Sequence, residues 1–294
     1  MIDLMVPYWG DPSYMLEMIA SVRAQTNPHW RLTIIDDDYP GTVIRDHVAD
    51  IDDERIRYVR KARNEGIIEN FRSCVDGASA PYMAMPGCDD RLLPDYVETI
   101  LSAAERHPDA SILQPGVRVI DENGDVTRTL PDLVKQKVVR PRVDGEALLS
   151  GEPLAVSLLH GDWLYWPSLA FRTADIQAVR FRDGFPIILD LALVLDMIYA
   201  GASLVAMDTV AFEYRRHAGS LSSDALVGGS RFDDERAYFR IAAAQAEALG
   251  WDRARRAAML HLTSRAYAGL TLPAALRTRE LSGLRALARH VISF

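Results

Sequence analysis

Residues 81–95 have the sequence PYMAMPGCDDRLLPD, which joins an apolar run to a turn and two adjacent carboxylates. The apolar run has the length of a strand, and Pro86-Gly87 ends it because neither residue continues a regular ladder. Asp89 and Asp90 then lie on the turn. In chains that alternate strands and helices, ligands bind at the carboxyl ends of the strands. The pair therefore suggests a divalent-cation site, with capping of the following helix as the alternative.

The residues before this stretch alternate between strand and helix patterns. Apolar runs of strand length occur at 4–6, 32–35 and 57–59, and helical periodicity occurs at 12–22, 43–48 and 67–74. The second run leads directly into Asp36-Asp37-Asp38. This alternation predicts a mainly parallel sheet with helices on both faces. No glycine-rich phosphate loop follows any of these strands, which argues against dinucleotide-binding and P-loop proteins.

The later residues are less regular. We expect helices at 94–105 and 191–201, a hairpin formed by 111–119 and 126–130, and strands at 169–171, 204–207 and 210–214. Residues 131–151 are polar without a clear period, and we interpret them as a mobile loop. A Gly/Ser-rich joint at 228–230 precedes an Ala- and Arg-rich helical stretch. The predicted division is a catalytic domain at 1–222 and a C-terminal helical region at 223–294.

Composition is that of a soluble globular protein, with 49% hydrophobic and 25% charged residues. No stretch approaches the roughly 18 apolar residues of a membrane span, and the first residues lack the basic region of a signal peptide, so we expect a cytoplasmic protein. Cys74 and Cys88 lack metal-ligand spacing, which predicts reduced thiols. The net charge of −8 argues against nucleic-acid binding.

The C-terminal residues have the opposite charge. From residue 252 onward there are eight Arg against one Asp and one Glu. Leu281, Leu284, Leu287 and Val291 share one helical face beside Arg side chains. Such a face is typical of peripheral membrane contact, where the acceptor would be a lipid-linked sugar, and equally of packing on the body or on a second subunit. Of these alternatives, we favour packing of this helical face over membrane contact.

Several motifs, in their order and spacing over residues 3–222, together resemble the family 2 inverting glycosyltransferases. They are Val6-Pro7-Tyr8, Ser21 to Thr26, Asp36-Asp37, Asn64-Glu65-Gly66 with Asn70, Gly87 to Asp90 with Pro94, Asp190, and Tyr214-Arg215-Arg216-His217. The resemblance implies an α/β protein with the GT-A fold, a Rossmann-like α/β/α sandwich with a mainly parallel central sheet, here followed by a C-terminal helical appendage. It implies transfer of a sugar from a UDP- or dTDP-sugar donor to an acceptor hydroxyl.

The resemblance also implies roles for single residues. Nucleotide binding is implied for Pro7 and Tyr8 over the base, for Asp36 and Asp37 as acceptors from the base and ribose, and for Asn64, Asn70 and Asp89. A Mn²⁺ or Mg²⁺ ion is implied at Asp89, assisted or oriented by Asp90, with His217 as a late ligand or diphosphate contact. Hard oxygen ligands suit these ions, which act on the leaving diphosphate as Lewis acids.

Asp190 is implied as the general base that takes the proton of the acceptor hydroxyl. Its structural alternative is the N-cap of the helix that follows. Trp163, Tyr165 and Trp166 are candidates for stacking on the acceptor, which would be a glycan, a lipid-linked sugar or a small molecule. Burial in the core is the alternative for these three aromatic residues.

Three positions depart from the family pattern. Gly87 replaces the first Asp of the metal motif, Leu189 replaces a Glu before the catalytic Asp, and Asp38-Tyr39 replaces a Gly-Ser pair. These departures keep a second class open, a non-catalytic sugar-nucleotide-binding or scaffold protein. A nucleotidyltransferase is less favoured, because residues 8–11 do not form a glycine-rich basic phosphate loop.

Overall fold

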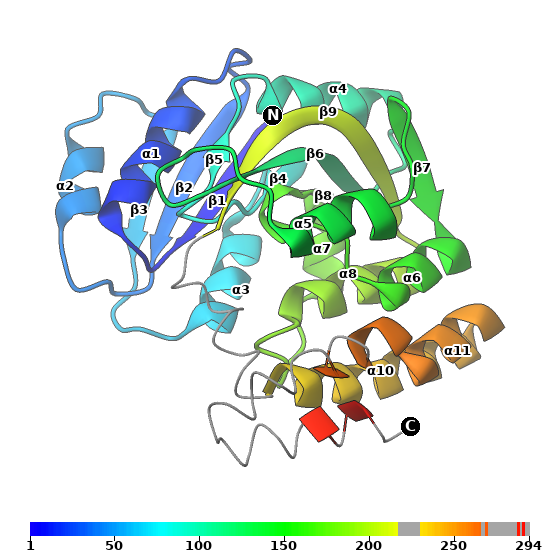
Figure 1. The fold of residues 1–294 in the computed structure, drawn as a ribbon. Coiled ribbons are helices and arrows are strands. Elements are labelled where there is room, and N and C mark those ends of the chain that lie inside the picture. Colours follow the sequence, from blue (N-terminus) through cyan, green and yellow to red (C-terminus); the bar gives the residue numbers. More distant parts are fainter. Residues whose placement is uncertain (217–229, 266–267, 270–286, 289, 292–294) are drawn as a thin grey trace.

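A computed structural model gives the fold and describes residues 1–216, 230–265, 268–269, 287–288 and 290–291. These residues form one nine-stranded sheet in the order β3-β2-β1-β4-β8-β6-β9-β5, with β7 also paired to β9 (Figure 1). The strands are β1 (Ile2–Tyr8), β2 (Trp30–Asp36), β3 (Ile56–Arg60), β4 (Tyr82–Ala84), β5 (Arg91–Leu92), β6 (Ile112–Ile120), β7 (Glu146–Ser150), β8 (Ala170–Arg172) and β9 (Ser203–Arg215).

The two halves of the sheet differ in strand direction. Strands β3, β2, β1 and β4 are all parallel, as the alternation in the first ninety residues predicts. In the other half β6 and β9 are parallel, but β8, β5 and β7 run antiparallel to their neighbours. The expectation of a mainly parallel sheet therefore holds for the first half, where crossover helices join neighbouring strands, and the second half is mixed.

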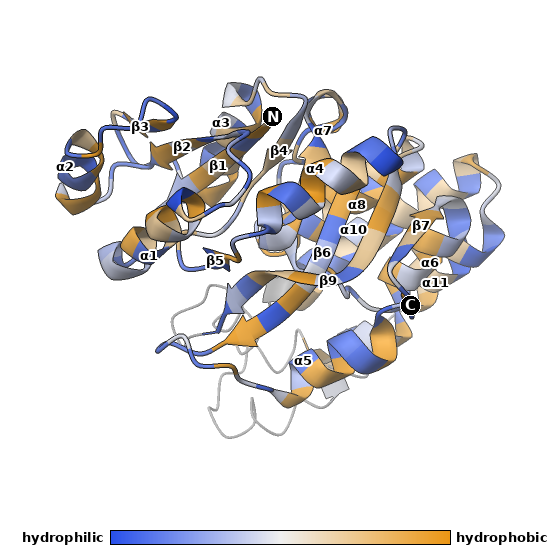
Figure 2. Cartoon of the chain, turned by 90° about the horizontal axis from the view of Figure 1, so that it is seen from above, coloured by the Kyte–Doolittle hydropathy of each residue, from blue (hydrophilic) through white to orange (hydrophobic). Residues whose placement is uncertain are grey.

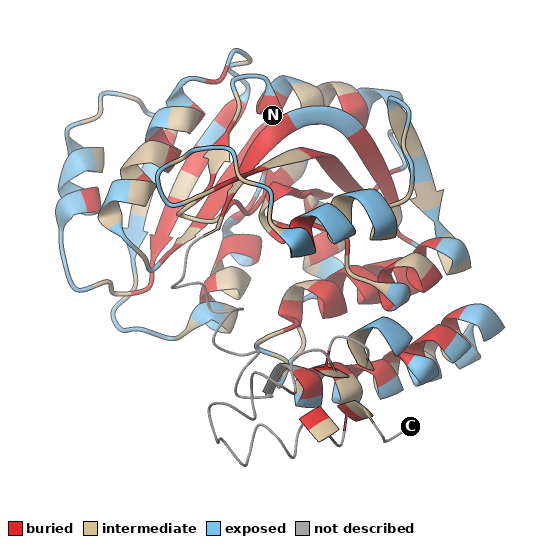
Figure 3. Cartoon of the chain, viewed as in Figure 1, coloured by how far each residue is buried: buried red, intermediate tan, exposed pale blue. Residues whose placement is uncertain are grey.

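Helices cover both faces of the sheet, which confirms the three-layer α/β/α arrangement. Buried side chains of α1, α2 and α4 form one apolar cluster, and those of α3, α6, α7 and α8 form the other. Figures 2 and 3 show the apolar, buried strands between these layers. The helices are α1 (Pro12–Arg23), α2 (Val43–Ala49), α3 (Ile67–Gly77), α4 (Tyr96–Arg106), α6 (Gly151–His160), α7 (Thr173–Val179) and α8 (Leu189–Tyr199), with a short 3₁₀ turn η2 (Trp166–Ser168).

The C-terminal helices extend this second layer. Helices α10 (Ser230–Ala248) and α11 (Asp252–Leu260) lie under α8 and α6 in Figure 1, and Tyr238, Ala242 and Ala257 belong to the same buried cluster as α8. Leu287 and Val291 pack with Phe232, as the packing interpretation predicts. Leu281 and Leu284 lie outside the described residues, and so does the joint at 217–229, so the domain division stays a prediction.

Three expectations from the sequence are corrected. Residues 131–151 are not a loop but contain α5 (Leu130–Val134), a π-helix η1 (Lys135–Val139) and β7. The two strands expected at 204–207 and 210–214 are one strand, β9, with register shifts against β6. The expected hairpin is reduced to a single antiparallel bridge between Ile120 and Val126.

Two further observations concern cysteines and membranes. Cys74 and Cys88 are free thiols, as predicted. Within the described ranges, no helix is both long enough and apolar enough to cross a membrane. The cytoplasmic location stays a prediction.

Candidate active site

The carboxyl ends of β1, β2, β3 and β4 lie at one edge of the sheet, because these strands are parallel. Tyr8 at the end of β1 is in register with Asp36 at the end of β2. The loop after β4 lies against the loop after β1, since a Cβ added to Gly10 would meet the sulfur of Cys88 at 2.8 Å. The sequence motifs expected to bind the nucleotide and the metal therefore border one site.

Asp36 and Asp37 are buried, and their carboxylates are occupied by neighbouring loops. Asp36 accepts a hydrogen bond from the backbone N–H of Tyr39 at 2.7 Å and one from the hydroxyl of Tyr58. Asp37 accepts from the N–H groups of Glu65 and Gly66 at 3.0 and 2.8 Å. In this structure the pair holds the loops that border the site and does not point into open solvent, in contrast to the direct base and ribose contacts that were expected.

The two asparagines also hold backbone. The side-chain oxygen of Asn64 accepts from the N–H of Gly66 at 3.1 Å. Asn70 is buried and its amide donates to the carbonyl of Ile35 at 3.1 Å, which ties α3 to β2. Both side chains therefore hold the backbone at the border of the site through hydrogen bonds.

Trp9, which the sequence analysis treated as loop, is the exposed aromatic ring at this edge. Tyr8 is 1% exposed and packs against Tyr39 with ring centroids 5.1 Å apart, so its ring has no free face, whereas Pro7 is half-buried. Trp9 is 51% exposed and meets Tyr39 edge-on at 5.5 Å. β1 is buried on both faces and ends at Tyr8, so Trp9 is the first residue beyond the strand and its ring reaches the surface.

The carboxylates of Asp89 and Asp90 are not equivalent. Asp90 is buried, and it accepts hydrogen bonds from the N–H groups of Arg215 at 2.9 Å and Gly87 at 3.2 Å. Burial, and then the charge of Asp89, raise the pKa of Asp90. Of the two roles expected for Asp90, assisting or orienting, the structure favours orienting. Asp89 is half-buried and is the more accessible carboxylate of the pair.

Gly87 makes room for both carboxylates. A Cβ at this position would lie 2.6 Å from Oδ1 of Asp89 and 2.7 Å from Oδ2 of Asp90. These distances are far below van der Waals contact, so a side chain at position 87 is incompatible with the observed arrangement. The glycine is thus part of this corner and not only a missing ligand.

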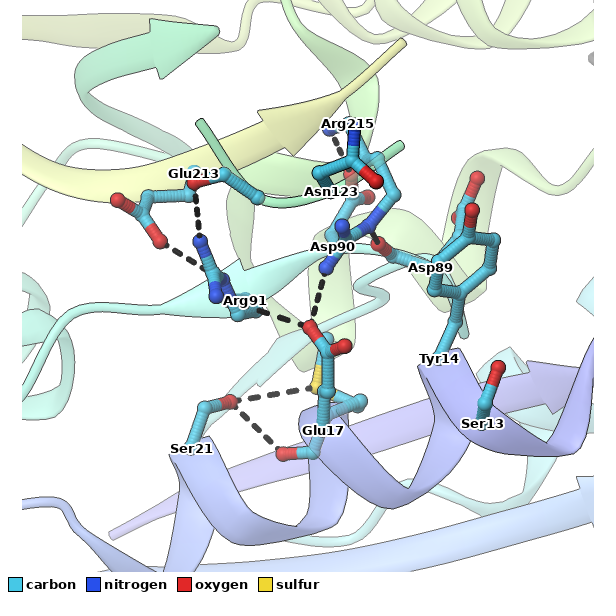
Figure 4. A network of polar contacts seen from close by, with 12 residues as sticks. Ser13, Tyr14, Glu17, Ser21, Asp89, Asp90, Arg91, Asn123, Glu213 and Arg215 are labelled. Atoms are coloured by element: carbon cyan, nitrogen blue, oxygen red, sulfur yellow. Dashed lines mark hydrogen bonds and ion pairs between the residues drawn. The ribbon is translucent and has the colours of Figure 1, made fainter. Parts of the chain in front are cut away.

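Arg215 fixes the corner from the end of β9 (Figure 4). Its buried guanidinium donates to the carbonyl of Asp89 at 2.7 Å and forms an ion pair with Glu17 of α1. It also donates to the carbonyls of Asp121 and Glu122, each at 3.2 Å. One side chain thereby joins the metal motif, the first helix and the turn after β6, a role that the sequence analysis missed.

Asp190 is the second residue of α8, and Ile188 is the N-cap, so the capping alternative does not describe it. One carboxylate oxygen accepts from the N–H of Leu191 at 2.8 Å. A carboxylate in the first turn of a helix is stabilised by the free N–H groups and the helix dipole. The residue is half-buried.

The expected acceptor platform is corrected. Trp163 is fully buried, and its indole N–H donates to Ser157 at 3.1 Å. Trp166 stacks on Phe71 at 6.2 Å inside the same core. These two tryptophans therefore pack in the core and present no ring face to an acceptor.

Tyr165 is buried too, with 4% of its surface exposed, and it packs edge-on against Tyr214 with the ring centroids 5.2 Å apart. We call these two rings the aromatic wall. The hydroxyl of Tyr165 donates to Asp132 at 3.0 Å, and Arg216 also donates to Asp132 at 2.8 Å. Burial raises the pKa of Tyr214, and the charges that act on it next are those of Arg216, Asp90 and Asp89. Arg215, which follows Tyr214 directly, donates to the carbonyl of Asp89 at 2.7 Å, so the wall adjoins the Asp89 corner.

Lys135 of η1 covers one face of Tyr165, with its ammonium group 4.4 Å from the ring centroid. The carboxylates of Asp162 and Asp190 are the strongest charges acting on that lysine. His217, the expected late metal ligand, follows Arg216 directly but lies outside the described residues.

A metal site at this corner depends on Asp89. Among the residues whose positions are described, no three His, Cys, Asp or Glu side chains gather in a metal-binding group. Mg²⁺ is commonly held by one or two carboxylates together with substrate phosphates and waters. A single half-buried carboxylate beside a diphosphate fits that pattern.

A family profile and two curated relatives relate the chain to glycosyltransferases. The sequence profile of the family described as "Glycosyl transferase family 2" matches residues 3–152. An uncharacterized glycosyltransferase of Methanocaldococcus jannaschii is 25% identical over 144 residues, which are 48% of this chain and 50% of that protein. The putative glycosyltransferase EpsE of Bacillus subtilis is 26% identical over 113 residues, 37% of this chain and 40% of that protein. The chain spans half or less of the length of these relatives.

Solved structures share the fold. The crystal structure of an S. aureus TarS fragment matches 99% of this chain and 81% of that chain, with a TM-score of 0.70 at 11% identity. The same fragment in complex with UDP-GlcNAc matches 98% of this chain and 91% of that chain, with a TM-score of 0.65 at 12% identity. The profile match covers half of the sequence, and the chain belongs to glycosyltransferase family 2.

Proposed function

We propose that the chain transfers a sugar from a UDP- or dTDP-sugar to an acceptor hydroxyl, with inversion at the anomeric carbon and with the help of Mn²⁺ or Mg²⁺. The observation that carries this proposal is the corner after β4, where hydrogen bonds of Arg215 hold Asp89 and Asp90 beside the loop that follows β1. The TarS neighbour in complex with UDP-GlcNAc supports a uridine-linked donor.

The donor would lie along the ends of β1, β2 and β4. Trp9 offers the nucleobase an exposed ring, supported by Tyr39, and the loops fixed by Asp36 and Asp37 border the ribose. The diphosphate would lie beside Asp89, where a bound divalent ion would neutralise the charge of the leaving group. Arg215 keeps this turn in place by donating hydrogen bonds to the carbonyl of Asp89 and to the carboxylate of Asp90.

The chemical step would fall to Asp190. As the acceptor oxygen attacks the anomeric carbon, Asp190 takes the proton of that hydroxyl. The new carbon–oxygen bond forms opposite the bond to the diphosphate, which breaks with its electron pair, and the nucleoside diphosphate leaves. Attack from the opposite face inverts the anomeric configuration.

Replacing the base gives the first test. We predict that Asp190→Asn lowers hydrolysis of UDP-GlcNAc, or of another UDP-sugar that the wild type hydrolyses, by about 10²–10⁴-fold. Because the amide is isosteric and lies away from the Asp89 corner, UDP affinity measured by calorimetry with Mn²⁺ should stay within about twofold. Asp183→Asn, a nearby exposed carboxylate paired with Arg72, is the matched control.

Full activity of Asp190→Asn would remove this residue as the base. A wild-type protein that binds UDP but hydrolyses and transfers nothing would favour the non-catalytic sugar-nucleotide binder, which the departures at Gly87 and Leu189 keep open. Calorimetric titration of UDP with and without Mn²⁺ tests the metal assignment. Asp89→Asn should lose the Mn²⁺-dependent part of UDP binding. Unchanged Mn²⁺ dependence in this variant would contradict the assignment of Asp89.

A further inference from the structure

Lys135 lies on a short helical segment, here called the strap, that hydrogen bonds fix to the rest of the protein. The strap, defined as α5 and η1 together, crosses in front of β6 and β8 in Figure 1. Asp132 joins it to Tyr165 and Arg216 at 3.0 and 2.8 Å. Gln136 donates to the hydroxyl of Tyr165 and to the carbonyl of Val117, at 3.2 and 3.3 Å. Lys135 is therefore held at a fixed place over the aromatic wall.

The backbone at Lys135 is itself unusual. Lys135 begins a π-helix, a conformation that is rare and occurs frequently at functional sites. Two later residues of this helix point outward: Lys137 is exposed, and Val138 is 76% exposed. Lys135 is half-buried and turned toward Tyr165. Within this π-helix, Lys135 thus faces Tyr165, whereas Lys137, two residues later, faces solvent.

The ammonium group of Lys135 has a ring as its neighbour but no ion pair. It lies 4.4 Å from the centroid of Tyr165, and within the described part of the chain no carboxylate lies at ion-pair distance from it. Asp132, the carboxylate of its own strap, is already paired with Arg216. A half-buried cation with no described carboxylate at ion-pair distance keeps part of its desolvation cost, and a bound oxyanion would offset that cost.

The strap lies against the loop that leads to Asp162. A Cβ added to Gly161 would lie 2.7 Å from the side chain of Val139, which belongs to the same π-helix as Lys135. Burial lowers the pKa of Lys135, and the charges of Asp162 and then Asp190 raise it, which supports the same placement. Lys135 thus lies beside the loop of Asp162, with the proposed base among the charges that act on it.

We propose that Lys135 binds an oxyanion of a substrate, a phosphate or carboxylate group, beside the hydroxyl that Asp190 deprotonates. The proposal rests on the proposed function and adds a substrate feature to it. An anionic group of the acceptor is the source that the placement beside Asp190 favours, and the diphosphate of the donor is the other source of the same chemistry. Lys135 would thus determine which substrates bind productively.

The test uses Lys135→Met, which removes the charge, Lys135→Arg, which keeps it, and Lys137→Met as the exposed control from the same π-helix. UDP and uridine are titrated into each protein with Mg²⁺. Inorganic phosphate is then titrated into protein saturated with UDP and Mg²⁺, at ionic strength matched with sodium chloride. Thermal melting of each variant checks that the fold is kept.

For an acceptor anion, we expect phosphate to bind the UDP-saturated wild type and Lys135→Arg, with at least tenfold weaker binding to Lys135→Met. The affinity of UDP would then be equal in all variants. For the donor diphosphate, Lys135→Met would weaken UDP at least tenfold and leave uridine unchanged. Either result supports oxyanion binding by Lys135 and identifies its source.

Equal binding of UDP and of phosphate by Lys135→Met and the wild type would overturn the inference while leaving the proposed function intact. A wild type that binds no UDP would instead contradict the proposed function, and the inference would fall with it. If Lys135→Met melts well below Lys137→Met, Lys135→Gln replaces it, and the contrast between Lys135→Gln and Lys135→Arg decides.

Discussion

At the scale of single residues, the glycine at position 87 is required by the two carboxylates that follow it. The peptide N–H of Gly87 donates to Asp90, and the carboxylates of Asp89 and Asp90 occupy the space of its absent side chain. An aspartate at position 87, which the family pattern contains, would therefore need a different arrangement of this loop. The departure is compatible with a working metal corner that uses one principal carboxylate.

We predict that Gly87→Ala weakens Mn²⁺-supported UDP binding by about tenfold or more, because the added Cβ displaces Asp89. Because the atoms that the Cβ meets are the ends of side chains, the free energy of unfolding should fall by only about 1 kcal/mol. Gly269→Ala is the control, since a Cβ there meets none of the described atoms within 4 Å. Tighter UDP binding by Gly87→Asp would show that the loop accepts the family arrangement and would contradict this account.

The positions of the site residues were predictable where local pattern determines them. Asp89 follows a short strand and Asp190 starts a helix, and strand ends and helix starts can be located from apolar periodicity. The hydrogen-bond partners of Asp36 and Asp37 were not predictable, because they come from residues up to 29 positions away in the chain. Burial of Trp163 and Trp166 likewise depends on partners that only the fold brings together.

At the scale of elements, the path of β9 beside β6 determines where Arg215 lies relative to Asp90. It runs beside β6 from Leu204 to Arg215, with register shifts around Gly116. A Cβ at Gly116 would lie 2.6 Å from the carbonyl of Asp208 and 2.9 Å from that of Thr209. Close approach of the two backbones at this glycine lets β9 bend and still place Arg215 at Asp90.

We predict that Gly116→Ala lowers the free energy of unfolding by about 1–3 kcal/mol, because a backbone carbonyl cannot move aside as a flexible side chain can. The shift of β9 should also weaken Mn²⁺-supported UDP binding, although Gly116 itself is remote from the ligand. Urea denaturation and calorimetry measure the two effects. Gly41→Ala is the stability control, since its Cβ would make an ordinary 3.5 Å contact with Tyr39. Unchanged stability would contradict a close-packed bulge.

The first four strands were predictable because each is followed by a helix of clear period. The strap was not, since its α-helix and its π-helix have only five residues each and their periods differ. Its position is fixed by contacts with Arg216, 84 residues away, and with Tyr165. Long-range anchors of this kind leave no local pattern in the sequence.

At the scale of the whole molecule, the C-terminal helices complete the layer that supports the proposed base. The hydroxyl of Tyr238 in α10 donates to the carbonyl of Ala192 at 3.0 Å and to Asp196 at 3.1 Å, both in α8. Asp190 lies in the first turn of that same helix. The described C-terminal helices are thus part of the support of α8, and loosening them should reach the site.

Two buried histidines tie these helices together. His261 and His290 lie with ring centroids 5.0 Å apart, and the Nε2 atom of His290 is 2.7 Å from the hydroxyl of Ser264. Burial lowers the pKa of both rings, that of His290 to about 4. An imidazole with a depressed pKa in the folded state contributes stability above its unfolded value near 6.5, and that stability is lost as the pH falls toward 4.

We therefore predict that the wild type loses roughly 2–3 kcal/mol of unfolding free energy through His290 between pH 7 and pH 4.5, because the unfolded chain binds the proton more tightly. Urea denaturation at both pH values measures this loss. His290→Gln keeps a nitrogen near Ser264 but cannot titrate, so its stability should fall less over the same interval. His29→Gln, at an exposed position, should follow the wild type. Equal pH dependence in His290→Gln and the wild type would mean that the C-terminal helices are not coupled to folding through this buried pair.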